Sequence, residues 1–154
     1  MMPTSNPVEA WESLFRAQVS IMRELRGEFS SNSMSMNEYD VLFNVIREPE
    51  GRIRLRDLNR NVLITQSSVS RLVDRLVQRG FLVKIDDRLD LRSTLIEITP
   101  DGRAEFTRAA RTHMRNIQER MTGALDPDEL RTLQYLCTKL RLGQAGGRGR
   151  DHDA

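Results

Sequence analysis

Residues 65–80, TQSSVSRLVDRLVQRG, place hydroxyl, amide and guanidinium groups at regular intervals along one short stretch. Serines come early in it, and guanidinium groups recur every four residues at Arg71, Arg75 and Arg79. Such groups make directional hydrogen bonds, since an amide can pair with adenine and a guanidinium with guanine or a phosphate. The stretch therefore carries the side-chain groups of a surface that hydrogen-bonds to the edges of bases or to phosphates.

The same stretch carries an apolar stripe at positions i, i+3, i+4, i+7 and i+8, namely Val69, Leu72, Val73, Leu76 and Val77. This spacing predicts a helix that buries one side, capped by Thr65 and ended by Gly80. Its opposite edge then exposes Gln66, Ser67, Ser70, Arg71 and Asp74. A solvated helix face stabilised by local charge is the alternative interpretation of that edge.

Two neighbouring elements would position this helix. Before it, LRDLNRNV at 55–62 predicts a short helix, and only LIT separates the two. After it, FLVKI and STLIEIT predict two strands of a β-hairpin, joined by the charged turn IDDRLDLR. Two helices joined by a three-residue turn and followed directly by a hairpin describe a winged helix-turn-helix.

The rest of the chain predicts flanking helices. Apolar spacing predicts helices over 8–29 and within MNEYDVLFNVIR at 36–47, the latter opening at 37–40. GRIRL at 51–55 alternates as a very short strand. Thr99 followed by Pro100 starts a helix over 100–122, and a capping box of Asp126 and Glu129 starts the last, over 126–142. The predicted fold is mainly α with a small β-hairpin wing.

Composition limits the class of protein. The chain has 154 residues, which we interpret as one domain. No apolar run is long enough for a membrane span or a signal-peptide core, and the single cysteine, Cys137, fits a reducing compartment, so we expect a cytoplasmic protein. Residues 52–92 hold ten Lys/Arg against five Asp/Glu, while the whole chain has a net charge of only +2. Basic charge is thus concentrated in the predicted winged region.

Several motifs together resemble the multiple-antibiotic-resistance regulator (MarR) family of bacterial winged-helix repressors. They are SSVSRLVDRLVQRGFLVK, DLRS in the turn and LIEITPDGRAEF after it, and the resemblance spans roughly residues 8–142. The positions that match the family's wing pattern are Asp90, Arg92, Ile98, Thr99 and Gly102. The sequence departs from the family at Arg54, where a hydroxyl cap is usual, and at Asn59, where a small alanine is usual.

The resemblance implies double-stranded DNA as the partner. Arg92 or its neighbour Arg88 would enter the minor groove, with Asp90 orienting Arg92 by a salt bridge; a pair that only rigidifies the hairpin is the alternative. Phosphate contacts are expected from Arg75 and Arg79, which lie further along the helix, and from Arg54. The expected DNA-binding set is Arg54, Thr65, Gln66, Ser67, Ser68, Ser70, Arg71, Arg75, Arg88, Asp90 and Arg92.

The outer helices carry more apolar residues than a helix-turn-helix can cover, and the family builds a twofold homodimer from such helices. The alternative is a self-contained monomeric core. A dimer implies a palindromic operator with half-sites about one helical turn apart. The expected organisation is a loose segment 1–7, a single domain 8–142 with a winged helix-turn-helix at 34–98 flanked by dimerisation helices at 8–32 and 100–142, and a disordered tail 143–154. The expected interface is Trp11, Phe15, Leu130, Leu133 and Leu136.

Many relatives release DNA when a small aromatic or amphipathic molecule binds. Met22, Phe43 and Met114 are candidate lining residues for such an effector, with ordinary core packing as the alternative. Cys137 lies among leucines, so we expect a buried, inert thiol and not a redox sensor.

No cofactor or metal site is expected, because His113 and His152 lie far apart in the sequence without a carboxylate cluster. Asp86 and Asp87 are expected to be solvated, which leaves no catalytic arrangement and argues against an enzyme. The rival to a DNA-binding regulator is a winged-helix protein-docking module, although such modules usually lack the basic edge and the wing arginine.

Overall fold

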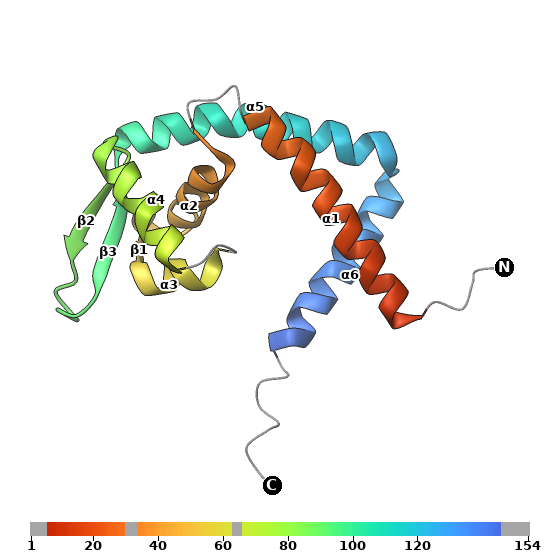
Figure 1. The fold of residues 1–154 in the computed structure, drawn as a ribbon, viewed down its shortest axis with the longest axis horizontal. Helices are drawn as coiled ribbons and strands as arrows, with labels where there is room; N and C mark the ends of the chain where they lie inside the picture. Colours follow the sequence, from red (N-terminus) through yellow and green to blue (C-terminus); the bar gives the residue numbers. More distant parts are fainter. Residues whose placement is uncertain (1–5, 30–33, 63–65, 146–154) are drawn as a thin grey trace, which may run out of the picture. The chain divides into compact units, whose positions relative to one another are not determined.

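The structure, a computed structural model, describes residues 6–29, 34–62 and 66–145. These residues form six α-helices, one short 3₁₀ turn and a three-stranded sheet (Figure 1). The mainly α fold with a small β wing is confirmed. In chain order the elements are α1 (Pro7–Phe29), α2 (Met36–Ile46), η1 (Pro49–Gly51), β1 (Arg52–Arg54), α3 (Leu55–Asn61), α4 (Gln66–Gln78), β2 (Leu82–Asp86), β3 (Thr94–Ile98), α5 (Pro100–Ala124) and α6 (Pro127–Ala145).

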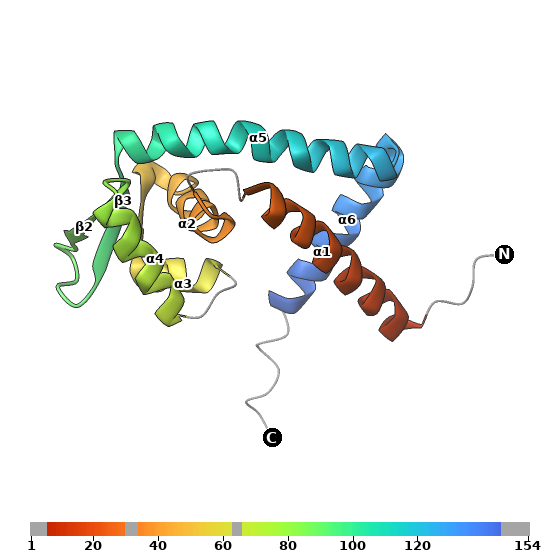
Figure 2. The same ribbon diagram turned by 45° about the horizontal axis from the view of Figure 1, so that its top comes forward.

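Contacts divide the chain after Met114 into two compact units. The first contains α1 to α4, the sheet and the start of α5, and the second contains the end of α5 and α6. The helix-turn-helix of α3 and α4 and the wing of β2 and β3 therefore belong to one unit, and Figure 2 shows them grouped around α2.

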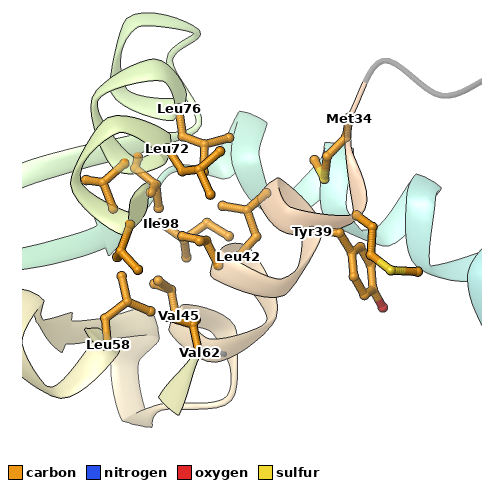
Figure 3. Packing of buried hydrophobic residues seen from close by; sticks show 14 of the residues in the cluster. Met34, Tyr39, Leu42, Val45, Leu58, Val62, Leu72, Leu76 and Ile98 are labelled. Carbon is orange, nitrogen blue, oxygen red and sulfur yellow. The ribbon is translucent and has the colours of Figure 1, made fainter. Parts of the chain in front are cut away.

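The core of the first unit lies between α2, α3, α4 and the sheet (Figure 3). The predicted stripe of α4 is confirmed, because Val69, Leu72, Val73 and Leu76 are each at most 8% exposed. Val41, Leu42 and Val45 of α2 are fully buried against it. Burying one such side chain is worth about 1.5–3 kcal/mol, so this packing fixes the rotation of α4 about its axis.

An aromatic cluster joins the end of α1 to α2 and α5. The His113 ring contacts Phe29 and Tyr39 edge-on, with centroid distances of 4.9 and 4.8 Å. Tyr39 also stacks on Phe106 at 4.8 Å. Burial lowers the pKa of His113, and the charge of Glu28 partly opposes that shift. The neutral imidazole is thus the form that suits this packing.

The strands form one antiparallel sheet in the order β1-β3-β2. The predicted hairpin of β2 and β3 is confirmed, with Leu82 opposite Ile98. The short strand expected at 51–55 is also confirmed as β1, and it pairs with β3 so that Ile53 lies opposite Ile96. Since α3 follows β1 directly, this pairing attaches the start of α3 to the wing.

The Thr-x-x-Gly motif at the start of α5 has a steric cause. The Thr99 hydroxyl donates to the Gly80 carbonyl at 2.6 Å and accepts from the Gly102 N–H at 3.0 Å, which confirms Thr99 as an N-cap. A Cβ at position 102 would lie 2.1 Å from the Phe81 carbonyl oxygen, so only glycine fits there. Gly80 has φ of 79°, as predicted for the end of α4.

The starts of α1 and α2 differ slightly from expectation, and α1 begins at Pro7 and not at Val8. α2 starts at Met36, because Ser35 caps it by accepting a hydrogen bond from the Glu38 N–H at 3.2 Å. The expected opening at 37–40 was therefore a few residues late. α1 ends at Phe29, and residues 30–33 lie outside the described residues.

The capping box of α6 is confirmed. The Asp126 carboxylate accepts from the Glu129 N–H, and the Glu129 carboxylate accepts from the Asp126 N–H, both at 2.9 Å. The helix continues to Ala145, so the expected disorder is wrong for 143–145. A single glycine in a helix costs only about 1 kcal/mol and does not by itself end the helix. Residues 146–154 lie outside the described residues.

Candidate nucleic-acid interface

α4 exposes the edge opposite its apolar stripe. Arg71, Asp74 and Arg75 are exposed and Ser70 is half-buried, as the spacing predicted. Ser68 is half-buried too. Gln66 and Ser67 form the first turn of the helix, while Thr65, the predicted cap, lies outside the described residues.

The arginines of α4 differ in their surroundings. Arg71 forms no ion pair with any described residue. Arg75 and Arg79 both contact the Glu38 carboxylate of α2, with N–O distances of 3.3 and 2.7 Å. Arg79 also lies over the Phe81 ring, 4.8 Å from its centroid. Arg71 is therefore the α4 arginine best placed to contact a ligand, while Arg75 shares its charge with α2.

Glu38 was missed by the sequence analysis, although the sequence contains a signal for it. It lies in phase with Val41, Leu42 and Val45, at positions i, i+3, i+4 and i+7 of the buried stripe of α2. Glu38 is itself only 5% exposed. An acidic residue on an apolar stripe requires cationic partners from another element, because an unpaired buried charge is very costly.

A contact from the wing reaches the exposed edge of α4. Lys84 on β2 donates to the Asp74 carboxylate of α4 at 2.5 Å. Both side chains are about half exposed, so the pair adds little stability. The contact shows that the first strand of the wing lies beside the polar edge of α4.

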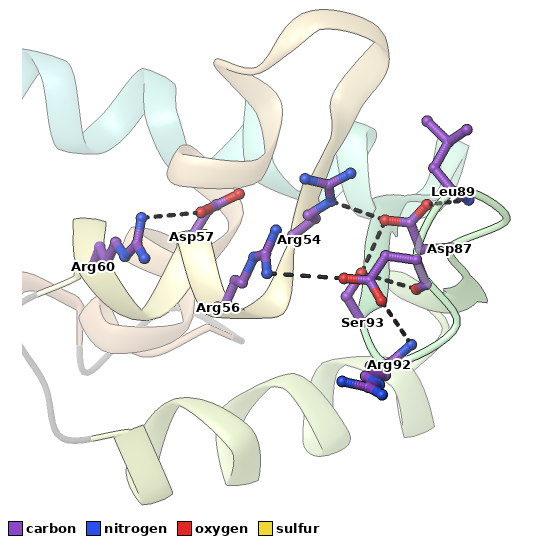
Figure 4. Close-up of polar contacts among 9 residues, drawn as sticks. Arg54, Arg56, Asp57, Arg60, Asp87, Leu89, Arg92 and Ser93 are labelled. Carbon is purple, nitrogen blue, oxygen red and sulfur yellow. Dashed lines mark hydrogen bonds and ion pairs between the residues drawn. The ribbon is translucent and has the colours of Figure 1, made fainter.

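The wing turn closes around the buried carboxylate of Asp87 (Figure 4). Asp87 is 3% exposed and accepts hydrogen bonds from the Leu89 N–H at 3.0 Å, the Ser93 hydroxyl at 2.9 Å and Arg54 Nε at 2.8 Å. The expectation that Asp86 and Asp87 are both solvated is wrong for Asp87. Neighbouring residues of an extended strand point to opposite sides, and only Asp86 is exposed.

These donors hold the pKa of Asp87 at about 2, below its ordinary value of 3.8. The Leu89 N–H lowers the pKa most, the Ser93 hydroxyl comes next, and Arg54 adds a hydrogen bond and its charge, while burial acts in the opposite direction. The carboxylate is therefore ionised at neutral pH. We call this cluster of Arg54, Asp87, Leu89 and Ser93 the wing latch.

Asp90 makes a second link between α3 and the wing. Its Oδ1 accepts from the main-chain N–H of Arg92 at 3.0 Å, and its Oδ2 lies 3.9 Å from Nη1 of Arg56. The resemblance implied a side-chain salt bridge from Asp90 to Arg92. In the described part of the chain, Asp90 instead holds Arg92 by its main chain, which leaves the exposed Arg92 guanidinium without a carboxylate partner.

Comparison with known proteins agrees with this arrangement. The family model described as "MarR family" matches residues 32–93. The multiple antibiotic resistance protein MarR of Salmonella typhimurium is 25% identical over 118 residues, which are 77% of this chain and 81% of that protein. The chain belongs to the MarR family. It is thus a winged-helix, DNA-binding transcriptional regulator in its general class.

Solved structures share the MarR fold with this chain. Sco3205, a MarR family transcriptional regulator from Streptomyces coelicolor solved in complex with DNA, superposes with a TM-score of 0.78 at 22% identity, covering 98% of this chain and 95% of that one. The organohalide-sensing regulator RdhR-CbdbA1625, solved in its 2,4-dichlorophenol-bound form, gives 0.70 at 20% identity, covering 93% and 88%.

The residues expected in a MarR-type dimer interface lie on α1 and α6. On α1, Trp11 and Phe15 are 60% and 52% exposed, and their rings stack at 5.7 Å. On α6, Leu136 is 49% exposed, while Leu130 and Leu133 are half-buried. Neither helix buries these residues fully within one chain.

The candidate effector residues differ in their exposure. Met22 packs half-buried against the core, whereas Phe43 and Met114 are exposed. Two hollows in the described part of the chain, one along α5 and one beside β1 and α3, are lined by other residues. Cys137 is half-buried, which differs from the expected buried thiol because α6 buries no residue fully within one chain.

The described residues hold neither a cluster of metal-ligating side chains nor a helix suited to span a membrane. No group of three or more His, Cys, Asp and Glu residues in this part of the chain is arranged to bind a metal ion. None of its helices combines the length and the apolar character that a membrane crossing requires.

Proposed function

We propose that the chain binds double-stranded DNA sequence-specifically as a homodimer and represses transcription until a small molecule releases it. The observation that carries the proposal is the position of Arg71, exposed on α4 without an ion pair in the described residues, on the edge that Lys84 joins to the wing. The DNA-bound form of Sco3205 supports the same use of this fold.

Base recognition falls to the N-terminal half of α4. In the major groove, Arg71 would donate two hydrogen bonds to guanine, a contact worth about 1–3 kcal/mol of discrimination. Gln66 would pair with adenine, and the small side chains of Ser67, Ser68 and Ser70 would allow close approach of the helix. Arg75 would reach a phosphate, although Glu38 limits its reach.

The wing adds contacts in the minor groove. Arg88 and Arg92 are exposed, and neither forms an ion pair with a described residue. A planar guanidinium suits a narrow, electronegative minor groove. Asp90 serves as a positioning residue for Arg92 through its main-chain N–H. The Arg54 side chain is 33% exposed and is bound to Asp87 in the wing latch. A phosphate contact is therefore a secondary role for Arg54.

Dimerisation would cover the exposed apolar residues of α1 and α6. Tyr135, Leu140 and Leu142 of α6 are each more than half exposed, and α6 buries no residue fully within one chain. A twofold dimer presents two copies of α4, which predicts a palindromic operator. We expect Leu136→Glu together with Leu140→Glu to yield a monomer in sedimentation velocity, whereas Thr138→Glu on the same helix should stay dimeric.

The effector is proposed to be a small aromatic or amphipathic molecule that contacts Phe43 and Met114. The dichlorophenol-bound form of RdhR-CbdbA1625 supports this chemical class. Such a ligand weakens DNA binding if it favours a spacing of the two α4 helices that does not fit the operator. Bound DNA then weakens ligand binding by the same factor.

Fluorescence anisotropy with duplexes from the chain's own upstream region tests DNA binding. We expect one fragment to bind far more tightly than random duplex, and Arg71→Ala to remove about 1–3 kcal/mol of that preference. Arg131→Ala, on α6, is the matched control and should leave binding unchanged. Equal, weak affinity for all duplexes, indifferent to Arg71→Ala, would contradict the proposal and favour a protein-docking module.

A further inference from the structure

The wing turn carries two large apolar side chains that the described residues leave almost fully exposed. Leu89 is 91% exposed and Leu91 is 88% exposed, the highest values among the large apolar residues of the described chain. In sequence they alternate with charged residues, in the order Arg88, Leu89, Asp90, Leu91 and Arg92. Single exposed leucines are ordinary on protein surfaces, but here two of them occur within three residues of one turn.

The turn is held from its inner side and needs neither leucine side chain. The Asp87 carboxylate accepts from the Leu89 N–H, and the Asp90 carboxylate accepts from the Arg92 N–H, both at 3.0 Å. The Ser93 N–H donates to the Asp90 carbonyl, also at 3.0 Å. Figure 4 shows the Leu89 side chain pointing away from the Asp87 carboxylate. The conformation of the turn is thus fixed by its carboxylates, while the leucines are left free for a partner.

The charges around the leucines indicate the partner. Arg88 and Arg92 are exposed without ion pairs in the described part of the chain, whereas Asp90 is engaged with Arg56. In sequence, the two exposed leucines are therefore flanked by two exposed cations. The DNA minor groove is complementary to this arrangement, with phosphates along both walls and apolar sugar faces between them. An uncharged apolar partner would leave both guanidinium groups without a counter-charge.

We propose that Leu89 and Leu91 enter the minor groove of the operator as an apolar wedge, with Arg88 and Arg92 on its phosphate walls. The inference rests on the proposed function and adds two specificity-determining residues to it. Leucine is one of the side chains that partly unstack a base step from the minor groove and bend the duplex. Flexible pyrimidine–purine steps are the least costly to deform, so the wing would select them without a hydrogen bond to a base.

The test compares the full-length wild-type chain with two double variants, Leu89→Ala/Leu91→Ala and Leu89→Met/Leu91→Met. Each is titrated against the best-bound upstream duplex across a salt series, and duplex bending is followed by energy transfer between end labels. We expect the alanine variant to bind about 10- to 100-fold more weakly because apolar burial is lost. The slope of log affinity against log salt should not change, since no phosphate contact is removed. The methionine variant keeps the apolar area and should bind and bend DNA like the wild type.

Three results would overturn the wedge. The first is an alanine variant that binds and bends the operator as the wild type does. The second is a change in salt slope without loss of bending, which would assign the leucines only an indirect effect on the arginines. The third is unchanged DNA binding with loss of self-association in sedimentation, which would make the patch a contact between copies.

The failure of the proposed function gives a different result. In that case the wild-type chain binds every duplex with the same affinity, and the proposed wedge is contradicted as well. Thermal unfolding checks that the variants fold, and we expect all of them to melt with the wild type because both leucines are almost fully exposed.

Discussion

The Glu38 carboxylate of α2 accepts a hydrogen bond from Arg79 of α4 at 2.7 Å, at a site where Glu38 is only 5% exposed. Arg75 contacts the same carboxylate at 3.3 Å. These contacts hold the C-terminal half of α4 against α2, while the proposed base-reading residues occupy its N-terminal half. The direction of α4 is thus set from the end opposite to the proposed base-reading residues.

Removing this carboxylate should destabilise the fold. We expect Glu38→Ala to lower the free energy of unfolding by about 1–3 kcal/mol, because Arg79 loses its counter-charge beside the core. Urea unfolding measures the change. Glu12→Ala, which breaks an exposed pair with Arg16 on α1, should cost less than about 1 kcal/mol. Equal losses in the two variants would show that the Glu38 contacts behave like a surface pair.

Asp87 of the wing latch should become protonated at a lower pH than an ordinary aspartate. The pKa of Asp87 is about 2 in the folded chain against an ordinary 3.8, so the unfolded chain binds the proton first as pH falls. The stabilisation is therefore complete above about pH 4 and is lost as pH falls through about 2.

Carbon NMR titration of the Asp87 carboxyl group tests this prediction. Its midpoint should lie near 2 in the wild type, and Ser93→Ala should raise it because one of the strongest donors is lost. Arg54→Gln should raise it by a smaller amount, in line with the weaker effect of Arg54. A wild-type midpoint near the ordinary 3.8 would mean that the latch does not form.

Sequence periodicity predicted the parts of the fold that local spacing determines. The stripe of Val69 to Val77 predicted α4 and which side of it is buried, and Asp126 with Glu129 predicted the start of α6. In both cases the interacting residues lie within a few positions of one another, so the pattern is readable without knowledge of the fold.

Contacts between distant segments were not predictable in the same way. Arg54 and Asp87 are 33 residues apart and Glu38 and Arg79 are 41 apart. Only the folded chain shows that β1 joins the wing sheet and brings Arg54 to the turn. Asp87 looked like an ordinary solvated aspartate because the sequence does not show which side of the strand end faces inward.

Asn59 on α3 should be a site where substitution stabilises the chain. Its side-chain Oδ1 is buried and has no hydrogen-bond partner among the described residues. Asn59→Ala removes this unsatisfied acceptor and introduces a better helix former, so we expect a gain of about 1 kcal/mol. Thermal unfolding measures it, with Asn61→Ala at the exposed end of α3 as the control. A loss of stability at Asn59→Ala would indicate that the amide is hydrogen-bonded in solution.

His113 should make stability depend on pH near neutrality. Burial lowers its pKa below the ordinary 6.5, with Glu28 opposing the shift, so the unfolded chain takes up the proton first as pH falls. The free energy of unfolding should therefore decline below about pH 6.5 and stop declining once pH is below the pKa of the folded chain. The neutral ring between Phe29 and Tyr39 is the physical cause.

Urea unfolding at steps between about pH 7.5 and 5.5 follows the decline, a range in which ordinary carboxyl groups stay ionised. The chain has two histidines, so the variants His113→Gln and His152→Gln separate their contributions. We expect His113→Gln to flatten the decline and His152→Gln to retain it. An unchanged slope in His113→Gln would assign the pH dependence to another group and would show that protonation of the imidazole is tolerated within the aromatic cluster.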